Sequence, residues 1–316
     1  MYKRLNILKF RNYLMGGDSM KDKLKRGIRP YLYISPSWLV IGIVVLFPIL
    51  YTIAISFTNM NIWHWLDYRF IGGKNYIEAF QGLNSGFIKA LMRTILWTVC
   101  NITIQIILAL IISLLLNTEG LKGKGLYKTI MMLPWAMPAY ISALIWKYGM
   151  FQNDFGLLNQ VLRKFGLKGV GWLNGNVIAF VSCLMVNLWL ALPYMILMFY
   201  GGLQGIDKAY YESADMEGAT TVQKILYIII PILKPLVMPA IIMTTFVTFK
   251  QFDIIYLMTM QVGSKTGTNI HTIITYAYEN AFVTNNYGYS SALSVIIFII
   301  IVILTLINQK SLRKEV

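Results

Sequence analysis

Six long runs of apolar residues determine what this chain of 316 residues can fold into. An α-helix of roughly 20 apolar residues crosses a bilayer core of about 30 Å, so such runs indicate membrane spans. The composition agrees, because only 13% of the residues are charged, whereas soluble domains carry about 25%. The sequence therefore predicts an all-α membrane protein with six transmembrane helices, at residues 38–57, 95–116, 129–146, 177–200, 236–258 and 292–307.

Basic residues indicate which side of the membrane each loop faces. With the N-terminus inside, the cytoplasmic segments hold 18 Lys and Arg residues and the outer loops hold eight. Cytoplasmic loops collect Lys and Arg, so we expect both termini to be cytoplasmic. The same bias explains the net charge of +15 without a nucleic-acid partner. We divide the chain into a basic cytoplasmic segment (1–35), a transmembrane domain (36–310) with a cytoplasmic loop (204–235), and a cytoplasmic tail (311–316).

Motifs for several enzymatic chemistries are missing from the sequence. It contains no GxxxxGK[ST] phosphate-binding loop, no HExxH and no GxSxG. We therefore expect no ATPase site, no catalytic residue, no metal and no cofactor. Cys100 and Cys183 both lie in apolar runs and lack a metal-binding spacing. His64 and His271 fall in predicted outer loops, where we expect ordinary solvated side chains.

The cytoplasmic loop 204–235 interrupts this apolar pattern with a polar segment. Asp207 is placed to cap a first short helix, and Gly218 permits the turn that follows it. Thr220 and Gln223 have the spacing of a capping box for a second helix. Pro231 and Pro235 are expected to break that second helix before the fifth span. The residues alone fit a docking site for a soluble partner and an ordinary connecting loop equally well.

The same loop resembles the EAA loop in the permease subunits of binding-protein-dependent ABC importers. It reads Glu212-Ser213-Ala214, three residues, Gly218, nine residues, Ile228, one residue, then Ile230-Pro231. The similarity extends from about residue 30 to the C-terminus, and it is greatest to the larger permease subunit of maltose-type importers. The resemblance implies the type I importer fold and two separate ATPase subunits that bind the ATP. It also implies an ATPase-coupling role for Glu212, Ser213, Ala214, Gly218 and Pro231.

Two helix faces carry polar side chains where a transported solute would lie. At helical spacing, Asn187, Leu190, Ala191 and Tyr194 share one face of the fourth span; Thr244, Thr248 and Gln251 share one face of the fifth, with Val247 beside them. Amide, hydroxyl and phenol groups suit a neutral polyhydroxyl ligand, although interhelical hydrogen bonds would use the same residues. By the resemblance, these eight positions match those of the family's maltose site, and some residue types differ.

We therefore expect a permease subunit of a carbohydrate importer in the cell membrane, which forms half of the pathway for a sugar or oligosaccharide. The expected partners are a second, homologous permease, two cytoplasmic ATPases and an extracytoplasmic binding protein docked on outer loops 59–87, 150–176 and 259–288. One alternative is a permease for another solute, such as glycerol phosphate. Another is an ion-driven secondary transporter, although Asp253 is the only carboxylate within a predicted span. A membrane-anchored assembly factor that uses 204–235 to bind proteins is a third.

Overall fold

The computed structural model describes residues 20–81, 86–259 and 270–314. In this part of the chain the regular secondary structure is helical, apart from one isolated bridge between Thr58 and Phe70. Five helical stretches are long and apolar enough to cross a membrane, and a bent pair of helices makes a sixth span if it is counted as one. They are Tyr31–Ser56, Gly86–Asn117, Asn176–Gln204, Thr221–Thr259 and Tyr287–Leu306, with the bent pair Lys124–Ala136 and Ala139–Met150. The predicted fold class is confirmed.

Residues up to Ala54 form a compact unit of their own. In this unit α2 (Met20–Ile41) continues through a π-helical turn, η1 (Gly42–Leu46), into α3 (Phe47–Ser56). Pro48 has no N–H, and a proline ring clashes with the carbonyl four residues earlier in a regular α-helix. The widened turn directly before Pro48 accommodates the ring without ending the helix.

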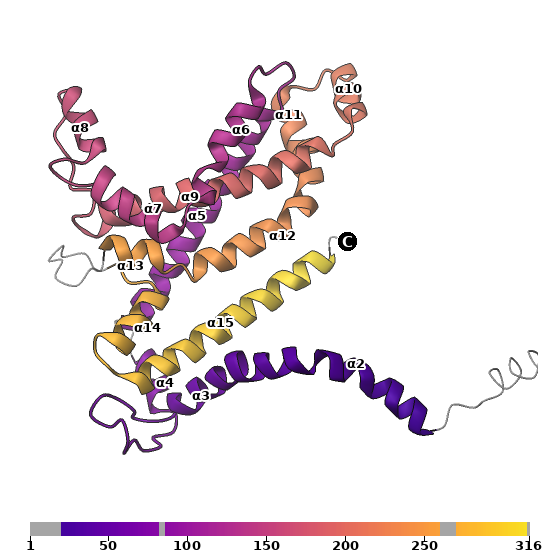
Figure 1. Cartoon of the computed structure of the whole chain (residues 1–316). Coiled ribbons are helices and arrows are strands. Elements are labelled where there is room, and N and C mark those ends of the chain that lie inside the picture. Colours follow the sequence, from indigo (N-terminus) through magenta and orange to yellow (C-terminus); the bar gives the residue numbers. More distant parts are fainter. Residues whose placement is uncertain (1–19, 82–85, 260–269, 315–316) are drawn as a thin grey trace, which may run out of the picture. The chain divides into compact units, whose positions relative to one another are not determined.

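Residues from Ile55 onward form the second unit, whose centre is a packed group of long helices. α5 packs on α9, and α12 packs against both. Short helices extend from the two ends of this group, with α10 and α11 near α6, and α8 and α13 away from them (Figure 1). The elements of this unit are α4 (Lys74–Phe80), α5 (Gly86–Asn117), α6 (Lys124–Met132), η2 (Pro134–Ala136), α7 (Ala139–Ile145), η3 (Trp146–Met150), α8 (Leu157–Lys164), α9 (Asn176–Gln204), α10 (Lys208–Met216), α11 (Thr221–Lys224), η4 (Ile225–Ile229), α12 (Ile230–Phe249), α13 (Asp253–Thr259), α14 (Ile273–Phe282) and α15 (Tyr287–Lys314).

The third span is bent rather than straight. Its two helical parts meet at an angle of 96° across Met137 and Pro138. Pro134 and Pro138 remove two backbone donors within five residues, and each ring excludes the carbonyl of the preceding turn. Between the two helical parts, the backbone forms a 3-10 turn, η2, followed by an extended residue, Met137, before α7 begins.

The expected helix break at Pro231 and Pro235 is wrong. The helix that starts at Thr221 continues through the π-helical turn η4 into α12, and both prolines lie within α12. The wide turn before Pro231 takes up its ring, as at Pro48. The fifth span breaks elsewhere, at residues 250–252, where α12 ends and α13 has not begun.

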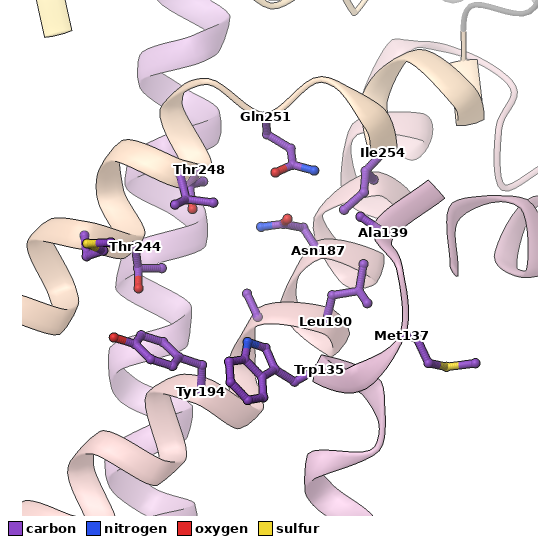
Figure 2. Close-up of a pocket in the computed structure, with 13 residues that line it drawn as sticks. Trp135, Met137, Ala139, Asn187, Leu190, Tyr194, Thr244, Thr248, Gln251 and Ile254 are labelled. Carbon is purple, nitrogen blue, oxygen red and sulfur yellow. The ribbon is translucent and has the colours of Figure 1, made fainter. Parts of the chain in front are cut away.

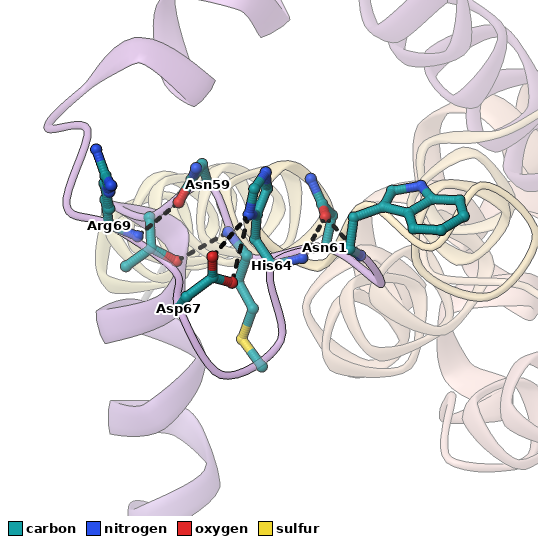
Figure 3. Close-up of polar contacts among 8 residues, drawn as sticks. Asn59, Asn61, His64, Asp67 and Arg69 are labelled. Atoms are coloured by element: carbon teal, nitrogen blue, oxygen red, sulfur yellow. Dashed lines mark hydrogen bonds and ion pairs between the residues drawn. The ribbon is translucent and has the colours of Figure 1, made fainter.

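The segment after the first span is a compact loop fastened by hydrogen bonds (Figure 3). Asn59 Oδ1 accepts the backbone N–H of Arg69 at 2.6 Å, and Asn61 Oδ1 accepts the backbone N–H of His64 at 2.9 Å. The loop is also joined to the start of α15, where the N–H of Gly288 donates to the carbonyl of Met60 at 2.8 Å. A Cβ at Gly288 would lie 2.2 Å from the carbonyl oxygen of Thr58, so this close approach requires glycine.

Candidate functional site

A pocket of about 450 Å³ lies between the bend of the third span, α9, and the break in the fifth span. Its volume falls within the range of about 300–1,000 Å³ that is usual for small-molecule sites. All eight residues predicted from the two polar faces line it. The lining consists of Trp135, Met137, Ala139, Asn187, Leu190, Ala191, Tyr194, Met243, Thr244, Val247, Thr248, Gln251 and Ile254. The residues of the two predicted faces therefore lie together in the structure, and their role in binding stays a prediction.

Gln251 reaches the pocket by a different route from the one expected. The spacing placed it on one continuous helical face with Thr244 and Thr248, but α12 ends at Phe249 and Gln251 lies in the break before α13. Its N–H donates to the carbonyl of Thr248 at 3.2 Å. The side chain lies at one end of the pocket, and Trp135 and Tyr194 lie at the other (Figure 2).

The bend in the third span places Trp135, which neither predicted polar face included, beside Tyr194 of α9, and the two rings form an aromatic wall of the pocket. The rings of Trp135 and Tyr194 are stacked, with centroids 6.0 Å apart and planes 25° apart. Stacked indole and phenol rings give a flat apolar surface with a hydrogen-bonding group on each ring. In the sequence, Pro134 and Pro138 indicate such a place, because a proline break within a membrane helix is tolerated where it lines a cavity.

Asn187 is held in place by a buried neighbour on α5. Its Nδ2 donates to Asn101 Oδ1 at 2.7 Å, and Asn101 Nδ2 donates to the carbonyl of Trp97 at 2.8 Å. Both asparagine side chains are buried. The alternative interpretation of the polar faces, that they form interhelical hydrogen bonds, is therefore correct for the side-chain NH₂ of Asn187. Asn187 nevertheless lines the pocket.

The lining chemistry is polar without charge. None of the thirteen lining side chains is acidic or basic, and the polar ones offer amide, hydroxyl, phenol and indole groups. Neutral hydroxyl groups can both donate to and accept from such side chains. A phosphate or carboxylate ligand would call for Arg, Lys or a helix N-terminus. The pocket therefore suits a neutral ligand that carries several hydroxyl groups.

The loop 204–235 has the local geometry that its residues predict. Asp207 accepts the N–H of Ala209 at 3.0 Å and caps α10, while Thr220 and Gln223 form a complete capping box at α11. Gly218 lies in the left-handed region, with φ at +74°. The turn closes because the N–H of Ala219 donates to the carbonyl of Ala214 at 2.9 Å, which satisfies the end of α10.

α10 has an anchored side and an exposed side. Ala214 is buried, and Tyr211 packs against the apolar core formed by α5, α9 and α12, where burial raises the pKa of its phenol. Glu212 and Ser213 are exposed. Pro231 lies beyond this turn in α12, so it is separated from the exposed face of α10 by α11 and η4.

Ion pairs tie this loop to itself and to the loop before α6. Lys208 Nζ lies 2.6 Å from Glu119 Oε1, and Lys224 pairs with Asp215. The Lys208–Glu119 hydrogen bond lowers the pKa of Glu119 and raises that of Lys208. Both side chains are largely exposed to solvent, so this pair orients the loops rather than stabilising the fold.

His271 differs from the expected solvated loop side chain. It lies just before α14, is largely buried, and its Nε2 is 3.1 Å from Glu279 Oε2. Burial lowers the pKa of His271, and nearby Arg93 lowers it further, while Glu279 acts in the opposite direction. His64 is exposed, as expected, and lies 3.4 Å from Asp67.

Known proteins match this chain over nearly its whole length. A family model described as binding-protein-dependent transport system inner membrane component matches residues 13–314. The trehalose/maltose transport system permease protein of Thermococcus litoralis is 31% identical, over 92% of this chain and 95% of that protein. The galactooligosaccharides transport system permease protein of Bacillus subtilis is 28% identical, over 94% and 75%.

The fold matches a solved structure as well. A chain in the crystal structure of a bacterial ABC transporter involved in the import of the acidic polysaccharide alginate superposes with a TM-score of 0.76. The match covers 93% of this chain and 98% of the other, at 20% sequence identity. At that identity the likeness establishes a common fold.

Proposed function

The chain belongs to the inner membrane components of binding-protein-dependent transport systems, and from this premise we propose that its pocket carries a neutral sugar or oligosaccharide across the membrane. It is a multi-pass permease subunit, a transport component without an ATPase domain. In the proposed complex it forms half of the pathway, and a second, homologous permease forms the other half.

The uncharged pocket is the observation that carries the proposal. Sugars are bound by hydrogen bonds to their hydroxyl groups together with an aromatic surface under the ring. Asn187, Thr244, Thr248 and Gln251 offer the hydrogen bonds, and the Trp135–Tyr194 pair offers the aromatic surface. The relatives from Thermococcus litoralis and Bacillus subtilis are named for trehalose, maltose and galactooligosaccharides, which are neutral saccharides.

The alternatives are less consistent with this pocket and with the family. Glycerol phosphate is an anion, and the lining has no Arg or Lys side chain to meet its charge. The other two alternatives, an ion-driven transporter and an assembly factor, disagree with the membership of this chain in the family of binding-protein-dependent transport components. The saccharide proposal therefore stands as the single candidate.

We further propose that α10 docks on a cytoplasmic ATPase subunit. Its exposed side presents Glu212 and Ser213, while on the other side Tyr211 packs against the core and Ala214 is buried. A helix held this way can transmit a rigid movement of its partner to the packed α5, α9 and α12. Gly218 and the capping box at Thr220 set the direction in which α10 projects.

The outer loops are proposed to receive the binding protein. Two of the three loops fall only partly within the described residues, since 82–85 and 260–269 lie outside them. Within 59–87, the segment from Asn59 to Phe70 is held by its own hydrogen bonds and exposes Trp63, Leu66 and Phe70. Exposed aromatic side chains on a fixed backbone are typical of protein-binding surfaces.

Uptake by the reconstituted complex tests the substrate class. The permease pair, the ATPases and the binding protein are placed in proteoliposomes, and ATP-dependent uptake of labelled trehalose, maltotriose, a galactooligosaccharide and glycerol 3-phosphate is measured. We expect uptake of at least one saccharide and none of glycerol 3-phosphate. Uptake of glycerol 3-phosphate alone would contradict the proposal.

A further inference from the structure

A short chain of hydrogen bonds behind the pocket begins at a backbone carbonyl of α5. The carbonyl of Trp97 accepts Asn101 Nδ2 at 2.8 Å, and Asn101 Oδ1 accepts Asn187 Nδ2 at 2.7 Å. Asn101 is 0% exposed and Asn187 is 4% exposed. Asn101 is not among the residues that line the pocket, whereas Asn187 is.

The two hydrogen bonds of this series can run in only one direction from donor to acceptor. A backbone carbonyl can accept but never donate, so the amide group of Asn101 must turn its NH₂ toward Trp97. The oxygen of Asn101 must then face Asn187, and Asn187 must donate to it with its own NH₂. The carbonyl oxygen of Asn187 is therefore the atom that Asn101 does not use.

The residue at which this series of hydrogen bonds begins, Trp97, is held firmly in place. The indole ring of Trp97 is buried and packs edge-on against Phe180 of α9, with ring centroids 5.7 Å apart. α5 and α9 also pack along their lengths. The carbonyl of Trp97, the side chain of Asn101 and the side chain of Asn187 therefore belong to one packed pair of helices.

We propose that Asn101 is a positioning residue for the pocket, which fixes the amide of Asn187 so that its carbonyl oxygen accepts a hydrogen bond from a substrate hydroxyl. The inference rests on the proposed function, because the ligand is taken to be a saccharide. A free asparagine could offer either end of its amide to the ligand. Fixing the acceptor end favours a ligand with a hydroxyl group at that place and disfavours one that lacks the donor.

The helix itself offers a matched control. Gln105 lies one turn further along α5 and is 0% exposed, and neither of its side-chain polar atoms has a hydrogen-bond partner among the residues that the structure describes. Asn101→Leu breaks the chain to Asn187, whereas Gln105→Met changes an equally buried amide that holds nothing. Any loss that comes only from altering a buried polar residue of α5 should appear in both variants.

The measurement is the number of maltotriose molecules taken up per ATP hydrolysed by the reconstituted complex, with trehalose as the probe if maltotriose is not carried. We expect Asn101→Leu to lower this ratio about fivefold, which corresponds to the contribution of roughly 1 kcal/mol from one buried hydrogen bond. Gln105→Met should stay within about twofold of the wild type. Wild-type coupling in Asn101→Leu, or an equal loss in both variants, would overturn the inference.

A double substitution separates positioning from a general structural role. If Asn101 acts only through Asn187, then Asn101→Leu should cause no further loss in a chain that already carries Asn187→Leu. Losses that multiply would show that Asn101 acts elsewhere and would overturn the inference. A wild-type complex that carries no saccharide would instead refute the proposed function, and this inference with it.

Asn101→Asp provides a second variant should Asn101→Leu fail to assemble. Burial favours the neutral acid, whose O–H can donate to Trp97 while its C=O accepts from Asn187, so the chain is restored. The ionised form can accept but cannot donate, so it breaks the chain at Trp97. Uptake by Asn101→Asp relative to wild type should therefore be higher at pH 6 than at pH 8, and a ratio that is low and does not change with pH would overturn the inference.

Discussion

Gly218→Ala tests whether the shape of the turn after α10 controls coupling. Gly218 has φ at +74°, where an L-residue costs about 1–2 kcal/mol. An added Cβ would meet no atom of the described residues within 4 Å, so the cost comes from the backbone rather than from a clash. A cost of this size lowers the population of the native turn relative to other turns by a factor of about 5–30. ATP-dependent uptake should therefore fall by up to this factor while the amount of protein in the membrane is unchanged.

Two further variants make this result specific. Gly218→Asn should restore part of the uptake, because asparagine adopts the left-handed region more readily than alanine. Gly201→Ala is the matched control, since a Cβ at Gly201 also meets nothing within 4 Å but the residue is helical within α9. Alanine favours a helix over glycine by about 1 kcal/mol, so this variant should transport normally. Normal uptake by Gly218→Ala would refute the argument that the left-handed turn is needed.

Three other substitutions test the remaining features. Glu212→Ala removes an exposed charge from α10, so uptake and ATPase co-purification should fall at least about tenfold while thermal stability in detergent changes by no more than about 0.5 kcal/mol; intact ATPase binding would contradict the docking proposal. Trp135→Ala should lower saccharide uptake about threefold to tenfold, the effect of losing an aromatic contact, while Trp135→Phe keeps most of it; equal uptake by both variants and wild type would exclude an aromatic wall. The pKa of His271 is below its ordinary value of 6.5 in the fold, so the unfolded chain binds more protons and stability should decrease as the pH falls through about 6.5. His271→Gln should weaken this pH dependence in thermal unfolding measured between pH 5 and pH 8. An unchanged dependence of stability on pH would contradict its attribution to His271.

Features set by neighbours in the sequence were predictable. Asp207, Thr220 and Gln223 cap their helices, and Gly218 turns the chain, because each acts on backbone groups within about three residues. The spans were predictable for a similar reason, since their length is fixed by the bilayer rather than by packing partners. Their starts were the less accurate part, because amphipathic residues such as those before Trp38 extend a helix beyond its apolar run.

Features that depend on other elements were missed. The sequence placed proline breaks at Pro231 and Pro235, but α12 continues through both, and the wide turn η4 directly precedes Pro231. Pro193 likewise lies inside α9 without ending it. Asn101 could not be found from the polar faces of the fourth and fifth spans, because its role depends on how α5 packs on α9. Trp135 follows Pro134 within the third span, but its place in the pocket depends on the size of the bend there and on how that bend lies against α9.

The pocket exists because two spans depart from helical geometry at the same place and still satisfy their backbone groups. Backbone that leaves a helix inside a membrane must find hydrogen-bond partners or line a cavity. Beside the bend, the N–H of Met137 donates to the carbonyl of Pro134 at 3.1 Å; within the break, the N–H of Gln251 donates to the carbonyl of Thr248 at 3.2 Å. Lys147 Nζ donates to the carbonyl of Leu257, near the C-terminal end of α13, at 2.9 Å. Lys147 therefore joins the outer part of the third span to α13, which also packs on α7. Since Trp135 lies at the bend and Gln251 in the break, the aromatic wall and the amide at the far end of the pocket both follow from irregular backbone, and straightening either span would remove one of them.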